Sequence, residues 1–320
     1  MEQSSKNNVV AVLKKQGIVL ALILVFAVFS VASKSFFSVE NIILIFRQMA
    51  TVGVLGAGMT FVIIGGNFDL SVGSLVSLCC VMCISLHDTI GPIPAILVTL
   101  VVGMVSGVVS GYLVGYLRLN SMIVTLGMMN ILQALALIWT DGKHVQLSDR
   151  SSWFTQIGKG SILGIPISTI IMAIVIVIFA VVLMKTVFGH QVMAVGGNEI
   201  ACRYSGINDK MVILKTFVLS GLAAAIGAIL LCSRGAAAQS TIGETMEFDA
   251  ISAVILGGAS LSGGSGNVFR TFIGVLILGI LENGFVLVGL PYYLQWVAQC
   301  LVILIAVYVD IRSKRKEAAA

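Results

Sequence analysis

The chain has 320 residues, of which 58% are hydrophobic and 10% are charged, and its mean hydropathy is +1.07. A soluble domain carries about 25% charged residues, so this chain has too few to cover a surface that faces water, and its surroundings must be lipid. The net charge of +5 does not point to nucleic acid, because basic loops beside a membrane explain it better. Lipid leaves backbone groups no partner outside a helix, so we predict an all-α, polytopic transmembrane helix bundle in one domain, residues 1–320.

Ten apolar segments can be drawn along the chain, which suits about ten spans of ~20 residues each. They are 17–33, 42–66, 70–87, 92–117, 121–140, 163–184, 212–232, 248–262, 268–290 and 293–310. The first follows Lys14 and Lys15 and resembles a signal peptide, but it is long for one, so we interpret it as an uncleaved first span. The third and eighth segments are short and rich in Gly and Ser, and we expect them to be broken or only partly spanning.

Lysine and arginine set the expected orientation. With the N-terminus in the cytosol and ten crossings, thirteen of the 19 Lys and Arg residues fall on the cytosolic side and six on the outer side. Cytosolic loops carry the excess of positive charge, so we predict that both termini are cytosolic. The polar loop 185–211 then lies in the cytosol, and the loop 141–162 lies outside.

A weak internal repeat pairs the third segment with the eighth. The pair Phe68-Asp69 recurs 180 residues later in the chain. An offset of five spans reverses the topology of the second copy, so the halves 42–140 and 212–310 would be inverted repeats. Such repeats are a common architecture for alternating access.

Four glycines recur at every fourth position of the segment 92–117. They are Gly103, Gly107, Gly111 and Gly115. This spacing puts a groove along one helix face, where the backbone of another helix can approach closely. We expect helix packing within the chain, with a subunit or gate contact as the alternative.

Polar residues in apolar surroundings are candidates for a translocation path. A first group, which follows the helix-breaking pair Gly65-Gly66, consists of Asn67, Phe68, Asp69 and Ser71, and the further candidates are Asn130, Asp249 and Asn283. Helix ends within a membrane commonly line a polar path, whereas Asp69 or Ser71 could also serve only as an N-cap. All these side chains could hydrogen-bond an uncharged polyhydroxylated solute or simply a neighbouring helix.

Nothing in the sequence predicts an enzyme or a metal site. The segment 261–265, Leu-Ser-Gly-Gly-Ser, resembles the signature of an ABC-type ATPase, but the chain has no G-x-x-x-x-G-K-[ST] phosphate loop, so a flexible turn is the better interpretation. The three histidines are far apart, and the cysteines lack metal-ligand spacing. We therefore expect no catalytic residue, no metal and no cofactor in this chain.

A polar segment, residues 188–208, lies between two apolar runs that are long enough to cross a bilayer. It contains a Gly-Gly pair at 196–197, an Asn-Glu start and a short helical run that a Ser-Gly pair closes. Glu199 and Arg203 are one helical turn apart and share a face. We expect a short cytosolic helix whose charged face contacts a partner protein.

Three segments together resemble the permease subunit of ribose-type ABC sugar importers. They are residues 63–74, 194–208 and 248–266, and their order and spacing match along residues 41–310. The resemblance implies a multi-pass protein of the bacterial plasma (inner) membrane that imports a monosaccharide such as ribose by alternating access. The implied partners are ABC ATPase subunits that bind ATP and Mg, a periplasmic or lipid-anchored sugar-binding protein, a second permease copy or a sister permease, and the lipid bilayer, but no nucleic acid.

The resemblance also implies that the short helix of the polar segment couples the chain to the ATPase. The residues that carry this role are Gly197, Asn198, Glu199, Ala201, Arg203, Ser205 and Gly206. Two alternatives stay open. An ion-coupled secondary transporter could also use inverted repeats, but it needs an ion-binding cluster among Asp69, Asp249 and Glu282. Branched-chain amino-acid permeases are distant relatives, so the importer could also carry a non-sugar solute.

Overall fold

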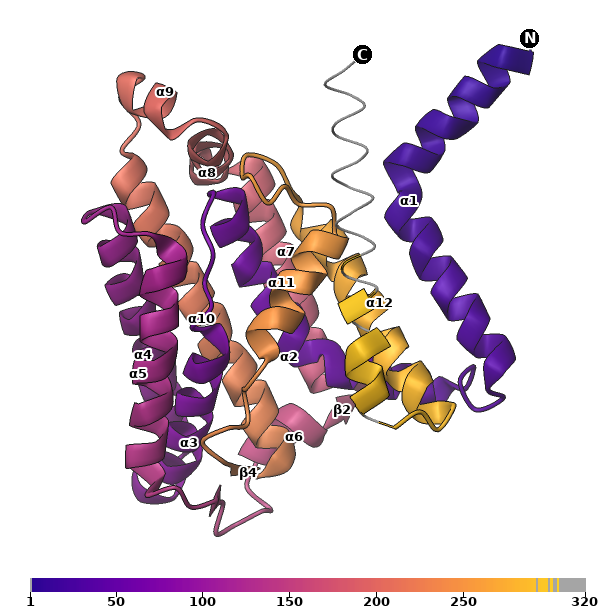
Figure 1. Cartoon of the computed structure of the whole chain (residues 1–320). Helices are drawn as coiled ribbons and strands as arrows, with labels where there is room; N and C mark the ends of the chain where they lie inside the picture. Colours follow the sequence, from indigo (N-terminus) through magenta and orange to yellow (C-terminus); the bar gives the residue numbers. More distant parts are fainter. Residues whose placement is uncertain (1, 292, 299, 302–303, 305–320) are drawn as a thin grey trace.

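The computed structural model describes residues 2–291, 293–298, 300–301 and 304, and this part of the chain is mostly helical (Figure 1). Its longer helices are α1 Glu2–Ala32, α2 Val39–Ile64, α3 Val72–Ile90, α4 Pro92–Gly115, α5 Ser121–Thr140, α7 Ile167–Lys185, α10 Asp209–Gly235 and α12 Val268–Leu287. The shorter ones are α6 Phe154–Lys159, α8 Val187–Gly197, α9 Glu199–Tyr204 and α11 Met246–Leu256. The short strands are β1 Val145–Gln146, β2 Ser161–Ile162, β3 Ile165–Pro166 and β4 Ala237–Ala238, and they pair as β1–β4 and β2–β3.

Seven helices in the described part of the chain are long and apolar enough to cross a membrane, namely α2, α3, α4, α5, α7, α10 and α12. A shorter apolar run, Gly17–Ala32, lies in α1. The predicted helical class is therefore confirmed, whereas the predicted count of about ten spans is not reached among these residues. One reason is α11, whose 11 residues extend for about 16 Å, roughly half of the ~30 Å hydrocarbon core. Half of the predicted last segment, 293–310, lies outside the described residues.

Helix α3 differs from its expected form. The sequence predicts a broken or short segment over 70–87, but α3 runs without interruption for 19 residues from Val72. The break lies before it, at Gly65 and Gly66, where α2 ends. Gly66 has a φ of +80°, which glycine adopts without steric strain, so the chain can turn sharply there.

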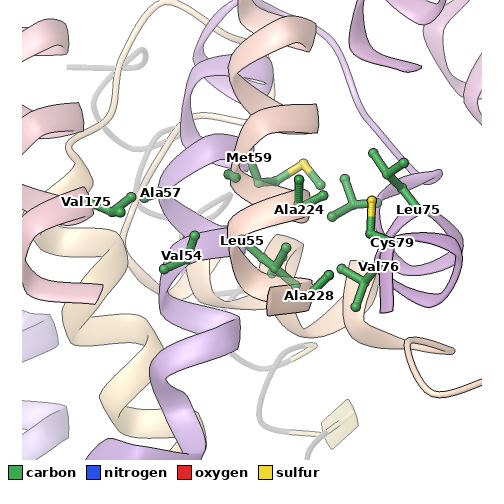
Figure 2. Close-up of a cluster of buried hydrophobic side chains, with 14 of the residues drawn as sticks. Val54, Leu55, Ala57, Met59, Leu75, Val76, Cys79, Val175, Ala224 and Ala228 are labelled. Atoms are coloured by element: carbon green, nitrogen blue, oxygen red, sulfur yellow. The ribbon is translucent and has the colours of Figure 1, made fainter. Parts of the chain in front are cut away.

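Helices α2, α3 and α10 form the centre of the bundle. Side chains from these helices and from α7 meet in one buried cluster, which includes Val54, Leu55, Ala57, Met59, Leu75, Val76, Cys79, Val175, Ala224 and Ala228 (Figure 2). Lipid tails are as apolar as leucine, so close packing and interhelical hydrogen bonds hold such a bundle together rather than hydrophobicity alone. The alanines of α10 suit this requirement, because small side chains let neighbouring helices approach.

The crossing of α4 with α10 is built from glycine. A Cβ added at Gly111 would lie 2.8 Å from the Leu214 Cα, and one at Gly107 would overlap the α10 backbone. Gly103 and Gly221 oppose each other, and a Cβ on either would collide with the carbonyl oxygen of the other. The glycine stripe thus makes direct backbone contact within the chain.

The crossing of α2 with α12 is built differently. Asn41 in the first turn of α2 and Asn283 of α12 exchange two amide hydrogen bonds, each 2.9 Å long. The Asn41 amide also donates to the Phe36 carbonyl at 3.0 Å. Both asparagines are buried, so these bonds satisfy groups that water does not reach.

Helices α8 and α9 lie at one end of the bundle, and α6 lies with the short strands at the other (Figure 1). We name these the α9 end and the α6 end. At the α6 end, β1 pairs with β4 in antiparallel fashion, with Val145 opposite Ala238. This pairing ties the long α5–α7 connection to the segment that follows α10.

Candidate functional site

The polar segment between α7 and α10 folds into α8 and α9. The Asn198 side chain accepts the Ala201 N–H at 2.9 Å and so caps the first turn of α9. The Ser205 N–H donates to the Ala201 carbonyl at the other end of the helix. Glu199 and Arg203 pair across one turn, with 3.0 Å between Arg203 Nη2 and Glu199 Oε1.

An ion-pair network surrounds α9. Arg118, in the turn between α4 and α5, contacts the Glu199 carboxylate and lies 2.6 Å from Asp209 Oδ2. Asp209 opens α10 and also receives Arg203, whose Nη2 is 2.9 Å away. The Asp209 side chain is only 5% exposed, so its charge depends on these two partners. The network therefore fastens α9 to the α4–α5 turn and to the start of α10.

The charged face of α9 pairs within the chain and stays partly exposed. Glu199 is 39% exposed and Arg203 is 57% exposed, and each pairs with Arg118 or Asp209, while their expected contact with a partner protein stays a prediction. Asp209 and then Glu199 hold the pKa of the Arg203 guanidinium above its ordinary value, because a nearby carboxylate favours the charged form. The charges of α9 thus position the helix.

Three well-exposed side chains of α8 and α9 are apolar or aromatic. Ile200 is 67% exposed, Tyr204 is 90% exposed, and Val187 at the start of α8 is 76% exposed. Gly197 ends α8, and Gly206, with a φ of +80°, lets the chain turn from α9 toward α10. Exposed apolar groups beside a charged network are typical of a protein contact surface.

Sequence reasoning missed Arg118 and Asp209. Arg118 is 81 residues from Glu199, so no local pattern joins them. Asp209 offered a signal, because it is the acidic residue that starts a long apolar helix directly after the polar segment.

Asp69 is buried in the break between α2 and α3. Its Oδ1 accepts the Ser71 N–H at 3.1 Å and the Ser71 hydroxyl at 2.6 Å, and its Oδ2 accepts the Ser220 hydroxyl of α10 at 2.8 Å. The neighbouring Phe68 N–H donates to the Ser121 hydroxyl at the start of α5, 3.2 Å away. The Asn67 amide turns back to the Gly65 carbonyl at 3.1 Å. Asp69 therefore links the segment before α3 to α10, whereas Ser71 makes no side-chain cap bond to α3.

A polar cavity of about 470 Å³ lies between α2, α11 and α12. Its polar lining consists of Asn41, Gln48, Arg234, Asp249, Glu282, Asn283, Gln295 and Trp296. It brings together Asp249 and Asn283, two of the predicted path residues, and adds polar groups that the sequence analysis did not single out. Amides and carboxylates can exchange hydrogen bonds with hydroxyl groups, and an indole ring offers an apolar face, so the cavity suits a small polar solute.

Asn130 lies apart from both groups. It is exposed on α5, and its amide donates to the Leu126 carbonyl of its own helix at 3.0 Å. Ile123, Ile131 and Ile138 on the same helix are also exposed. The predicted path residues thus fall in three places: the break at Asp69, the cavity, and the α5 face. In the described part of the chain, no three His, Cys, Asp or Glu side chains gather as a metal site would require.

Comparison with known proteins finds relatives that are named as sugar transport permeases. Residues 41–307 match the family described as branched-chain amino acid transport system / permease component. The chain is 38% identical to the ribose import permease protein RbsC of Haemophilus influenzae over 91% of each chain, and 40% identical to RbsC of Bacillus subtilis over 93% of each chain. It is 37% identical to the L-arabinose transport system permease protein AraH of Escherichia coli over 82% of this chain and 80% of that protein. No solved structure matches the chain.

Seven helices that are long and apolar enough to cross a membrane, together with relatives named as transport permeases, identify the chain as a multi-pass membrane transport protein. The chain belongs to the family of branched-chain amino acid transport system permease components, because the family match covers most of its length.

Proposed function

We propose that this chain is the permease subunit of an ATP-binding-cassette importer in the bacterial inner membrane, and that its solute is a monosaccharide such as ribose. The observation that carries the proposal is 38–40% identity, over 91–93% of the chain, to proteins named as ribose import permeases. ATP and Mg bind to separate ATPase subunits. This chain binds the solute transiently and changes shape.

A neutral sugar suits the cavity better than an ion. The buried amides Asn41 and Asn283 both donate and accept, which hydroxyl groups need. A sugar delivered by a binding protein requires only modest contacts inside the membrane, because the binding protein can supply specificity. An ion-coupled transporter remains the alternative, and Asp249 and Glu282, which both line this cavity, are the carboxylates it would use.

The proposed topology has about ten spans and cytosolic termini, with the α9 end in the cytosol, and it consists of two inverted repeats. The two helix crossings support the repeats, because an offset of 180 residues takes position 41 to 221 and position 103 to 283. The Gly103–Gly221 contact of α4 and α10 then corresponds to the Asn41–Asn283 contact of α2 and α12. Likewise α3 packs on α4 and α10, and α11 packs on α12 and α2.

The outward side of α9 is the proposed contact surface for the ATPase. Ile200 and Tyr204 would enter a groove on the partner, because aromatic and aliphatic anchors carry most of the energy of protein interfaces. Glu199, Arg203 and the other coupling residues hold the helix in place for this contact. The sugar-binding protein would dock at the α6 end.

The exposed face of α5 is the proposed contact for a second permease copy or a sister permease. A polar amide that faces lipid is unfavourable, so Asn130 is better placed against another protein or a polar path. The isoleucines beside it supply the apolar area that such a contact needs. Transport then proceeds by alternating access: ATP closes the ATPase pair, α9 moves, and the bundle opens toward the other side.

Reconstitution tests the proposal. The chain is purified with its ABC ATPase and placed in liposomes, and the uptake of radiolabelled ribose delivered by the binding protein is measured. We expect uptake only with ATP, and none by the chain alone under a proton or Na⁺ gradient. Gradient-driven uptake by the chain alone would establish the secondary transporter instead, and competition by leucine but not ribose would establish an amino-acid importer.

The contact surface has its own test. The double variant Ile200→Ala/Tyr204→Ala should lower the amount of ATPase that copurifies with the chain by about tenfold, since anchor residues at interfaces typically contribute 2 kcal/mol or more. The matched control is Leu163→Ala, which removes an equally exposed side chain at the α6 end, where Leu163 is 99% exposed. Normal copurification of the double variant would move the contact elsewhere on the chain.

A further inference from the structure

Three glycine pairs that are distant in sequence meet at the α9 end of the bundle. They are Gly65-Gly66 at the end of α2, Gly196-Gly197 at the end of α8, and Gly263-Gly264 in the loop between α11 and α12. The Gly264 N–H donates to the Ile64 carbonyl at 2.8 Å. The loop that we expected to be a flexible turn is therefore fixed to α2, beside α8 (Figure 1). We name this meeting point the glycine junction.

Backbone touches backbone throughout the glycine junction. A Cβ added at Gly263 would lie 2.6 Å from the Gly196 oxygen, and one at Gly264 would lie 2.9 Å from the Gly197 Cα. A Cβ at Gly196 would collide with the Ile64 carbonyl oxygen. Gly263 and Gly264 also have φ values of +82° and +80°, which other residues rarely adopt. The end of α2 and the loop between α11 and α12 therefore contact the end of α8 directly, without flexible side chains between the backbones.

The position of the glycine junction connects α9 to the candidate path. Asn198, the residue after Gly197, caps α9, so α8 ends where the proposed ATPase contact begins. The end of α2 leads within a few residues to Asp69. The loop between α11 and α12 leads back to Asp249 and forward to Asn283. Flexible side chains between two segments would absorb a small displacement of one segment, whereas close-packed backbones transmit that displacement to the neighbouring segment.

We propose that the glycine junction transmits the displacement of α9 to both segments that carry the acidic path residues, the break at Asp69 and the helix of Asp249. The inference rests on the proposed function, in which a partner ATPase moves α9. Gly196 is its central residue, since it touches both α2 and the α11–α12 loop. It positions the two segments and does not contact the solute.

The first test replaces Gly196 with alanine in the reconstituted importer. The added Cβ separates α8 from α2 and the loop, so we expect assembly and ATP hydrolysis to persist while sugar uptake per ATP falls by about tenfold, a typical allosteric coupling. The matched control is Gly235→Ala, which alters a glycine in the last turn of another helix but places its Cβ where no described atom lies within 4 Å. Uptake per ATP equal to that of the control would overturn the proposal.

A second test does not require a disruptive variant, and it decides the matter if Gly196→Ala fails to assemble. Spin labels are attached in pairs at Ala194→Cys on α8, Ser262→Cys and Leu163→Cys, all exposed positions outside the proposed ATPase contact, with the native Cys202 and Cys300 replaced by serine. On ATP binding, we expect the distances from 163 to 194 and from 163 to 262 to change together, while the distance from 194 to 262 stays constant.

The outcomes of the label experiment are distinct. A change between 194 and 262 as large as that between 194 and 163 would overturn the glycine junction, and so would three unchanged distances. Uptake by the wild-type complex is measured in parallel. Its absence would refute the proposed function, whereas normal uptake with independent movement of 194 and 262 would refute the glycine junction alone.

Discussion

The α4–α10 crossing and the α2–α12 crossing of this bundle are closed by opposite means. At the first, Gly103 and Gly221 bring two bare backbones together. At the second, Asn41 and Asn283 exchange amide hydrogen bonds beside a cavity of about 470 Å³. Under the proposed repeats these two contacts are equivalent and both join the two halves of the chain, so one contact between the halves is sealed where the other is polar and lies beside a cavity.

The acidic residues Asp69 and Asp249, one from each half of the chain, also lie in different surroundings. Asp69 is buried and accepts hydrogen bonds from Ser71 and Ser220, whereas Asp249, which also has a partner within the chain, lines the cavity. A glycine contact can open only by separating two helices, but an amide pair can exchange its partner for a hydroxyl group with little change in the number of hydrogen bonds. The comparison teaches that the α2–α12 crossing, with α11 beside it, is better suited to respond to a solute than the α4–α10 crossing.

The α4–α10 crossing should tolerate added side-chain volume less well than the α2–α12 crossing. Gly107→Leu forces a side chain into the α10 backbone, and we expect a loss of about 3 kcal/mol in the free energy of unfolding, the upper end for overpacking. Thermal unfolding and size-exclusion chromatography in detergent measure this loss. Gly17→Leu is the control, because no described atom lies within 4 Å of a Cβ at Gly17. Unchanged melting of Gly107→Leu would show that this face tolerates side chains.

The polar crossing should reveal its pairing in a double-mutant cycle. Asn41→Leu and Asn283→Leu each leave one buried amide without its partner, so we expect each to lose about 2 kcal/mol. The double variant removes both amides, and its loss should fall short of the sum by about 1 kcal/mol. Chemical unfolding in mixed micelles gives the three values. Strict additivity would mean that the two amides do not support each other.

The two acidic residues should separate stability from transport. Asp69→Asn weakens the bonds from Ser71 and Ser220, so we expect a loss of about 1.5 kcal/mol in stability. Asp249→Asn should lower stability less but reduce the rate of sugar uptake more, because Asp249 faces the cavity. Melting temperatures and initial uptake rates are compared for both variants. The reverse ranking in either measurement would contradict this difference between Asp69 and Asp249.

The smallest effect on folding is expected at the cavity wall. Gln48 is exposed in the described structure, so Gln48→Leu should change stability by less than about 0.5 kcal/mol. If sugar passes through the cavity, the loss of this amide should still raise the sugar concentration required for half-maximal uptake. A variant with wild-type uptake at every sugar concentration would place the path away from α2.

Local features of the fold could be predicted from the sequence. The segment 121–140 coincides with α5, because Asn120 caps its start and Asp141 adopts a left-handed conformation after its end. The number of membrane spans could not be predicted from the sequence, because hydropathy measures composition and not helix length. Residues 257–262 are apolar or small, yet they form the loop after α11.

At the candidate sites, too, some contacts could be predicted from the sequence and others could not. The pair of Glu199 and Arg203 follows from helical spacing alone. Arg118 and Asn41 could not be found, because their partners lie 81 and 242 residues away. The glycine stripe could be recognised from its period, although its partner helix could not. Sequence therefore predicts contacts within one helix, while contacts between distant helices require the structure.

The short length of α11 constrains how the protein is made. Its 11 residues include Glu247 and Asp249, so it is too short and too polar to leave the translocon for lipid as a single helix. One of its packing partners, α12, is synthesised after it, whereas the other, α2, is synthesised much earlier. We therefore expect α11 to insert only once α12 has emerged from the ribosome, as a hairpin of the two helices.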